Sequence, residues 1–396
     1  MSKVYSILLF LLCFVASTQL LAKYWAPYLL LDDILLLFLT LLCLFDLMVY
    51  NRFSRINATA SVLLGCFVIL SFIANFYSLD AFMVKLFYYI KPIVVFTMIG
   101  YLANKYMSLR YKRYLYNFFI LVCLFSLAEF YYVQFIDLNA MQYFSFSYRN
   151  GMYRASSVTW HPISLALLAF FSIIIGKEVI GDKRRWPYVL FLISLILSGT
   201  RFVMLFTAIY FLYRFLIQKS FVFRNHRFAA KHLFVYAYPF IFVLVLLLSS
   251  YVNIKDFSSL RSVSFRTGMP LLEDPGVLAV GTGIGSFGSY ESVVNQSEVY
   301  DRINFPQHYK EIMLNANKQT GTENFFFMAL IEFGVIGLFL YFTVLLRITS
   351  FKMTYFFSFY LLTVVCLSFV YPLNALPYLY LINIFFPFGK IITDKF

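Results

Sequence analysis

Residues 187–218 read PYVLFLISLILSGTRFVMLFTAIYFLYRFLIQ, two apolar runs separated by the tetrapeptide Ser198-Gly-Thr-Arg201. A helix satisfies its own backbone hydrogen bonds, so it is the structure expected of an apolar run in lipid. The tetrapeptide interrupts the pattern, and a guanidinium is costly in the hydrocarbon region. The stretch therefore predicts two short membrane helices, with Arg201 facing the protein interior or a water-filled cavity.

The same apolar character extends along the whole chain. The 396 residues are 62% hydrophobic and 13% charged, and they include 50 Phe and 32 Tyr, more apolar surface than a soluble domain can bury. We therefore predict an all-α, polytopic integral membrane protein with about 12 transmembrane helices. The predicted runs are 4–22, 27–50, 60–79, 82–104, 114–135, 157–176, 187–198, 202–218, 233–251, 323–346, 354–371 and 375–390.

Basic residues give this series of helices an orientation. The net charge of +14 would suggest nucleic acid in a soluble protein, but the Lys and Arg residues lie in short clusters between apolar runs. Every second connection is enriched in them, which by the positive-inside rule predicts cytoplasmic N and C termini. We expect N-terminal membrane helices over 1–251, one large extracytoplasmic loop over 252–322 and C-terminal membrane helices over 323–396. Nucleic acid is not an expected partner, whereas the lipid bilayer is.

Among the arginines on the predicted extracytoplasmic side, three are candidate ligand-binding residues, namely Arg154, Arg201 and Arg266. Guanidinium groups bind phosphate oxygens through two parallel hydrogen bonds, so an anionic, phosphate-bearing ligand is the natural inference. Arg154 could equally be an interfacial side chain, and Arg266 a solvated loop charge. Arg201 is the strongest of the three candidates because it interrupts a hydrophobic hairpin.

Other residues of the same side have two readings each. Gly281-Thr-Gly283-Ile-Gly285 could cradle a phosphate with backbone N–H groups, or could form a tight turn, since no strand precedes it. Glu323 could be a general base, or could sit at a helix start because the helix dipole favours acids there. His308 could be a base or simply solvated. No metal-ligand spacing is recognisable, and no cofactor is expected.

Two carboxylates lie inside predicted membrane helices. Glu129 and Glu332 are each surrounded in the sequence by apolar residues. An ionisable side chain inside a membrane segment normally faces the protein interior and is paired there. We therefore expect both to be buried with hydrogen-bonding partners.

Four segments, in chain order, resemble motifs of the O-antigen polymerase and O-antigen ligase superfamily of bacterial envelope enzymes. The resemblance also covers the arrangement of about a dozen helices with one large periplasmic loop near the C-terminal third. The segments are Tyr153-Arg154 followed by His161-Pro162; Leu197-Ser-Gly-Thr-Arg201-Phe; Arg266 followed by Gly281-Thr-Gly-Ile-Gly-Ser-Phe287; and Glu323-Asn324 followed by Gly334-Val-Ile-Gly337-Leu.

The resemblance implies a glycosyltransferase of the bacterial inner membrane with a periplasmic active site and an undecaprenyl-diphosphate-linked oligosaccharide as substrate. It implies catalytic roles for Arg201, Arg266 and Glu323, and substrate binding by Arg154, the three loop glycines, Asn324 and His308. Ligases of the superfamily typically carry His at the position of Glu323, which favours a polymerase. An O-antigen ligase and a lipid-linked oligosaccharide flippase remain the alternatives, and whether a polysaccharide chain-length regulator binds is left open.

Overall fold

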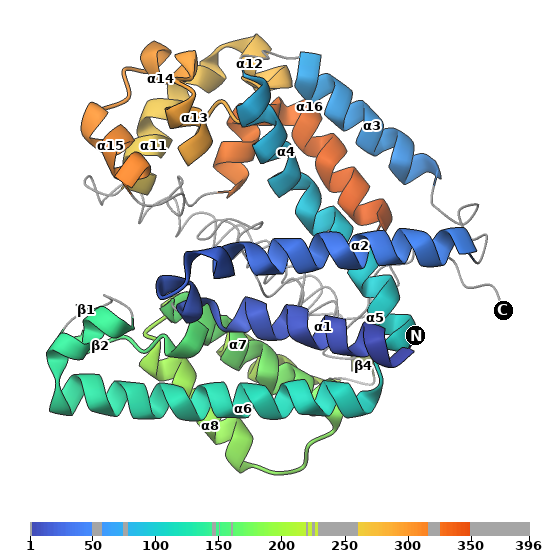
Figure 1. The fold of residues 1–396 in the computed structure, drawn as a ribbon, viewed down its shortest axis with the longest axis vertical. Coiled ribbons are helices and arrows are strands. Elements are labelled where there is room, and N and C mark those ends of the chain that lie inside the picture. The colour runs from blue at the N-terminus through green and yellow to red at the C-terminus, as the bar shows by residue number, and fades with distance from the viewer. Residues whose placement is uncertain are drawn as a thin grey trace. The chain divides into compact units, whose positions relative to one another are not determined.

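The computed structural model is almost entirely helical and divides into two compact units (Figure 1). Unit 1 comprises residues 1–55, 94–214 and 376–396, and unit 2 comprises 56–93 and 215–375. The residues that the structure describes are 2–49, 58–73, 78–144, 148–149, 151–159, 161–218, 221–223, 226–228, 260–315 and 325–348.

Unit 1 is a bundle of long helices joined by short helical turns and one small hairpin. Its strands β1 (Tyr148–Arg149) and β2 (Met152–Tyr153) pair antiparallel. Single turns of π-helix follow three of the helices, over Val95–Ile99, Tyr132–Ile136 and Gly176–Ile180. The α-helices are α1 (Ser2–Ser17), α2 (Leu31–Val49), α5 (Gly100–Tyr106), α6 (Leu109–Tyr131), α7 (Pro162–Ile175), α8 (Trp186–Leu197) and α9 (Arg201–Gln218).

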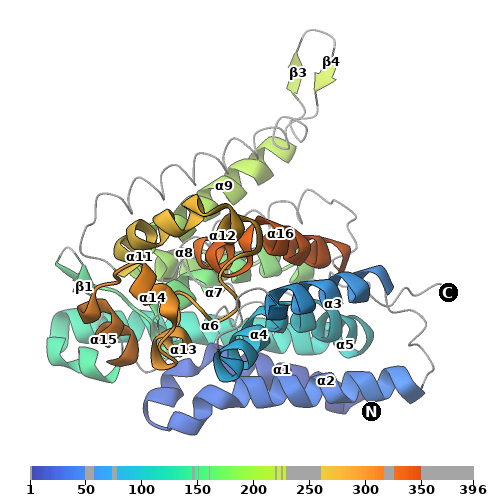
Figure 2. The same ribbon diagram turned by 90° about the horizontal axis from the view of Figure 1, so that it is seen from above.

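Helix α7 is the centre of this bundle and packs against α6 and α8 (Figure 2). Its residues are buried on every side apart from Ile163, as expected for a helix that is apolar all round. The helix begins at Pro162, whose missing N–H costs nothing at a first helical position. The preceding His161 accepts the Ile163 N–H through Nδ1 at 3.2 Å.

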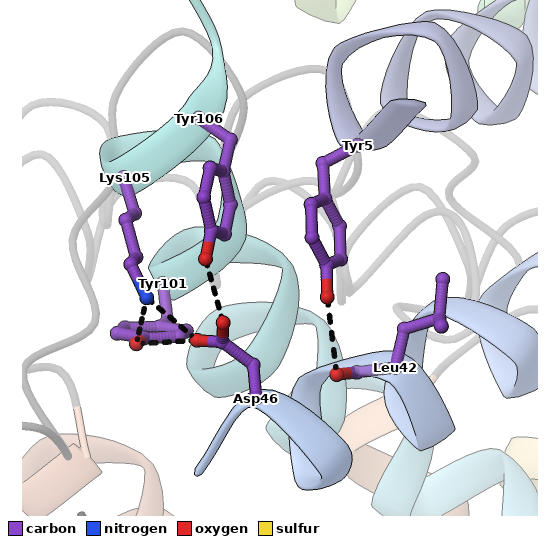
Figure 3. Close-up of polar contacts among 6 residues, drawn as sticks. All are labelled: Tyr5, Leu42, Asp46, Tyr101, Lys105 and Tyr106. Atoms are coloured by element: carbon purple, nitrogen blue, oxygen red, sulfur yellow. Dashed lines mark hydrogen bonds and ion pairs between the residues drawn. The ribbon is translucent and has the colours of Figure 1, made fainter. Parts of the chain in front are cut away.

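A polar cluster joins α2 to α5 within unit 1 (Figure 3). The Asp46 carboxylate accepts hydrogen bonds from Tyr101 at 2.9 Å, Lys105 at 2.7 Å and Tyr106 at 2.6 Å. The ring of Tyr5, on α1, stacks on Tyr106 with centroids 4.4 Å apart. A charged group in an apolar helix is thereby paired, and the cluster ties three helices together.

Unit 2 is built around α16 (Phe325–Ile348), which packs on α3 (Ala58–Ile73) and α12 (Pro275–Val280) (Figure 1). A second apolar core lies between α16 and the short helices of residues 260–315, where the Phe287 ring contacts the rings of Tyr300 and Phe327. The remaining elements of the unit are α4 (Leu79–Val94), α11 (Leu260–Gly268), a 3-10 turn (Met269–Glu273), α13 (Tyr290–Val294), α14 (Glu298–Arg302), α15 (Gln307–Asn315) and the hairpin of β3 (Phe221–Phe223) with β4 (His226–Phe228).

The predicted all-α membrane class agrees with this architecture. Among the described residues, four helical stretches are long and apolar enough to cross a membrane: Leu79–Tyr106, Leu109–Ile136, Pro162–Ile180 and Phe327–Val344. Shorter apolar helices cover Lys3–Ser17, Ser61–Ile73 and Trp186–Leu197. The predicted runs 233–251, 354–371 and 375–390 lie outside the described residues, so the total of about 12 spans stays a prediction.

Candidate functional site

The break between α8 and α9 forms where the sequence predicts it. Gly199 has φ of +61°, the left-handed conformation that commonly ends a helix and that favours glycine. Its N–H donates to the Ile196 carbonyl at 2.9 Å, which closes the last turn of α8. The chain then enters α9 at Arg201, whose side chain is exposed.

Arg154 packs directly on this break from a distant part of unit 1. Its Nε donates to the Ser198 carbonyl at 2.8 Å, and its Nη2 donates to Thr200 Oγ1 at 3.3 Å. A Cβ added to Gly199 would lie 3.1 Å from Arg154 Nε, so glycine also provides the room for the guanidinium. The structure thus places Arg154 in contact with Ser198 and Thr200, which immediately precede Arg201 in the chain.

The electrostatics of this arrangement favour an anion. Carbonyl groups at the C-terminal end of a helix carry partial negative charge, and Arg154 covers the one at Ser198. Arg201 lies at the N-terminal end of α9, where unpaired N–H groups carry partial positive charge. The Arg154 guanidinium and the N-terminus of α9, where Arg201 stands, therefore meet at one short polar segment, which we call the arginine break (Arg154 and residues 198–201).

The glycine-rich loop of unit 2 is a different kind of structure. Gly281, Gly283 and Gly285 have φ of +81°, +95° and +82°, a region that other residues rarely adopt. A Cβ on Gly281 would lie 2.3 Å from the Glu332 carbonyl oxygen, and one on Gly285 would lie 2.7 Å from the Ala81 carbonyl oxygen. Gly281 and Gly285 are therefore required for close backbone packing, as a tight turn would need.

The loop amides surround a carboxylate of the protein itself. Oε1 of Glu332 accepts the N–H groups of Gly285 at 3.0 Å and Phe287 at 3.2 Å, and Oε2 accepts the Tyr89 hydroxyl at 2.6 Å. Glu332 is fully buried, as expected from its place in an apolar helix. These two N–H groups are thus already hydrogen-bonded, and phosphate binding by the three loop glycines stays a prediction.

The same loop covers a break in α16. Gly334 has φ of +63° and ψ of −176° inside the helix, which frees carbonyl groups on its N-terminal side. The N–H groups of Thr282 and Gly283 donate to the carbonyls of Ile331 at 2.8 Å and Glu332 at 3.0 Å. Freed backbone groups at membrane depth need such protein partners. The sequence alone did not predict that the glycine-rich loop pairs with α16. The visible signal was Glu332 close to Gly334 and Gly337 in an apolar run.

Replacing Tyr89 with phenylalanine should test the Glu332 network. The change removes one donor from a buried carboxylate, and we expect it to lower the free energy of unfolding by about 1 kcal/mol. The measurement is thermal unfolding of the detergent-solubilised protein. Tyr131→Phe, at a side chain that is 61% exposed, is the control. Equal melting temperatures for the two variants would show that the hydrogen bond contributes nothing.

The remaining predicted residues belong to unit 2, and two of them are outside the described residues. Arg266 is exposed on α11, and His308 is exposed on α15 with its ring against Tyr309. Glu323 and Asn324 are not among the residues that the structure describes. The structure therefore assigns no geometry to the predicted base.

A buried phenol supports the segment that follows the glycine-rich loop. Tyr300 accepts the Gly288 N–H at 2.9 Å and shares a hydrogen bond with Ser292 at 2.7 Å. Burial raises the pKa of the Tyr300 hydroxyl, so this group stays neutral at physiological pH and acts as a structural donor and acceptor. It is a packing residue of the unit 2 core rather than a candidate acid or base.

Neither a metal cluster nor a known relative identifies the site. Within the described ranges, no group of three or more His, Cys, Asp or Glu side chains is placed to hold a metal ion. Comparison with protein-family models, with curated proteins and with solved structures finds no match to this chain. The function is therefore inferred from the residues themselves.

Proposed function

We propose that the chain is a polymerase of surface polysaccharide repeat units, which transfers a growing glycan from undecaprenyl diphosphate to another lipid-linked repeat unit. The observation that supports this most is the arginine break in a protein with long apolar helices. A lipid-linked diphosphate needs apolar surface for its tail and fixed cations for its head group. Guanidinium groups provide paired donors that match phosphate oxygens.

The chemistry requires no redox step. A sugar hydroxyl oxygen of the acceptor attacks the anomeric carbon of the donor glycan, and the bond from that carbon to the diphosphate oxygen breaks. The diphosphate keeps the electron pair, and the hydroxyl proton passes to a general base. Arg201 and Arg154 bind the diphosphate and stabilise the negative charge that develops on it as it leaves.

Arg266 and Glu323 keep the roles that the sequence resemblance implies. Arg266 would stabilise the leaving diphosphate, and Glu323 would accept the proton, with His308, Asn324 and the loop glycines in substrate binding. These residues belong to unit 2, so separate variants test them: Arg266→Ala and Glu323→Ala, each assayed alongside the arginine-break variants. A normal product from either variant removes that residue from the mechanism without affecting the arginine break.

The proposed location of the protein is the bacterial inner membrane. About 12 helices would cross it with both termini in the cytoplasm, and residues 252–322 would form a periplasmic loop. The support is the enrichment of basic residues in alternate connections, such as Lys105 to Arg113 and Lys177 to Arg185. Cysteine labelling with a membrane-impermeant maleimide, at Arg184→Cys and Arg302→Cys, should modify the second and not the first in intact spheroplasts.

Two other functions are compatible with the same substrate. An O-antigen ligase would transfer finished polysaccharide to lipid A core and would use the same diphosphate contacts. A flippase would move the lipid-linked unit across the membrane without a covalent step. Neither is favoured, because Glu323 differs from the histidine typical of ligases and because transporters usually contain internal repeats, which this sequence lacks.

Deletion of the gene in its host separates these functions. A polymerase deletion should leave lipid A core capped with a single repeat unit, and the wild-type gene should restore the ladder of longer products on a gel. If the deletion strain instead has lipid A core without any glycan and accumulates long lipid-linked polymer, the protein is a ligase. Single lipid-linked units that accumulate on the cytoplasmic face would identify a flippase, and an unchanged ladder would contradict all three.

A further inference from the structure

A buried carboxylate, that of Glu129, binds the chain segment that contains Arg154. Glu129 is on α6, and its side chain is 2% exposed. Oε1 accepts the Tyr153 hydroxyl at 2.5 Å, the Ser156 N–H at 3.0 Å and the Ser156 hydroxyl at 3.2 Å. Oε2 accepts the Ser157 N–H at 2.5 Å. One side chain therefore binds both ends of the segment 153–157.

The bound segment holds a conformation that its sequence alone does not favour. Ser157 has φ of +55°, in the left-handed region that is uncommon for residues other than glycine. Its hydroxyl donates to the Val122 carbonyl at 2.7 Å, about two helical turns before Glu129 on α6. Such a conformation persists where the surroundings hold it in place. Here Glu129 and the carbonyl of Val122 supply that constraint.

Arg154 lies within this segment. The next residue, Ala155, connects the segment to the end of α8. The Ala155 N–H donates to the Leu197 carbonyl at 3.1 Å, beside the Arg154 bond to Ser198. A continuous set of hydrogen bonds thus runs from Glu129 through residues 153–157 to the end of α8. These hydrogen bonds fix the backbone of residues 153–157. The position of the Arg154 guanidinium depends on them, because the backbone sets where the side chain begins.

We propose that Glu129 is a positioning residue, which fixes Arg154 against the Ser198–Thr200 break and thereby sets the affinity of the arginine break for a diphosphate. The second half of this inference rests on the proposed function. A carboxylate suits the task because both oxygens only accept, and all four groups around it donate. Glutamine at this position would turn an NH2 group toward one of those donors.

Hydrogen exchange on the purified protein tests the positioning role. In Glu129→Gln, peptides that cover 153–159 and 197–201 should exchange faster than in the wild type, while those covering 162–175 of α7 should not change. Glu178→Gln is the matched control, because Glu178 is a carboxylate of the same unit that accepts a hydrogen bond from Tyr210. If Glu129→Gln does not fold, Tyr153→Phe removes one donor only and should give a smaller change at the same peptides.

Binding of inorganic pyrophosphate tests the effect on affinity. Glu129→Gln should weaken pyrophosphate binding by about tenfold, because a small displacement of a positioned charge is costly. In a double-mutant cycle, Glu129→Gln should cause no further loss when Arg154 is already alanine. Unchanged exchange at 153–159, or losses that simply add, would overturn the inference.

These measurements do not use polymer synthesis as a readout. If the host deletion shows that the protein is not a polymerase, the exchange data and the Glu129–Arg154 coupling still decide whether Glu129 positions Arg154. If the deletion supports a polymerase while the cycle is additive, the proposed function stands and the role of Glu129 falls.

Discussion

Arg201→Ala should abolish the polysaccharide ladder in a complemented deletion strain, with the transfer rate reduced by about a hundredfold. The reason is that Arg201 is a cation at the start of α9, next to the residues that bind Arg154, and that it binds the diphosphate in the proposed mechanism. Charge that develops on a leaving diphosphate would then lack one of its stabilising donors. Arg201→Lys should restore only a small part of the activity, because an ammonium group cannot make the paired hydrogen bonds of a guanidinium.

The measurement is the length distribution of surface polysaccharide, with protein amount in the membrane measured in parallel. Arg302→Lys is the matched control, because Arg302 is an exposed arginine of α14 whose ion pair with Glu298 is solvent-exposed. It should give the wild-type ladder. Arg201 is itself exposed, so its removal should leave the protein level unchanged. A normal product length in Arg201→Lys would remove the bidentate role, and a normal length in Arg201→Ala would remove Arg201 from catalysis.

Gly281→Ala should destabilise the protein strongly, by about 3–5 kcal/mol, although it adds only one methyl group. The added Cβ would lie 2.3 Å from the Glu332 carbonyl oxygen and 2.6 Å from the Gly334 nitrogen. Both are backbone atoms of α16, so neither can move away as a flexible side chain would. The loop would have to separate from the break in α16 and would expose the buried Glu332 carboxylate.

Gly151→Ala is the control for a methyl group added at a positive φ without a steric clash. Gly151 has φ of +80°, close to the +81° of Gly281, but a Cβ there would meet nothing within 4 Å. The control should therefore lower stability by about 1 kcal/mol, the cost of a left-handed conformation alone. Thermal unfolding in detergent measures both variants. Equal effects at Gly281 and Gly151 would show that the close approach to α16 does not exist in solution.

Several features of the fold follow from local sequence. Apolar runs predict helices wherever they can be compared with described residues, because a helix is the structure that satisfies its backbone within one segment. Gly199 predicts the end of α8, and the apolar surroundings of Glu129 and Glu332 predict that both are buried and paired. Each of these conclusions depends on residues that are neighbours in the chain.

The partners of those residues could not be predicted in the same way. Phosphate binding and a tight turn were both compatible with the glycine-rich loop, and only the folded chain directs the N–H groups of Gly285 and Phe287 to Glu332. Similarly, the sequence around Arg154 gives no partner for its guanidinium, and only the folded chain brings that group to the Ser198 carbonyl.

The sequence by itself indicated a helical chain with apolar helices long enough to cross a membrane, an arginine at a helix break and acids buried in apolar helices. The tertiary structure decided which groups form hydrogen bonds with those acids and with the backbone at that break. The physical reason is that burial makes a hydrogen-bond partner obligatory but does not specify it. The partner is whichever donor the packing of distant segments brings within reach, as residues 153–157 are brought to Glu129.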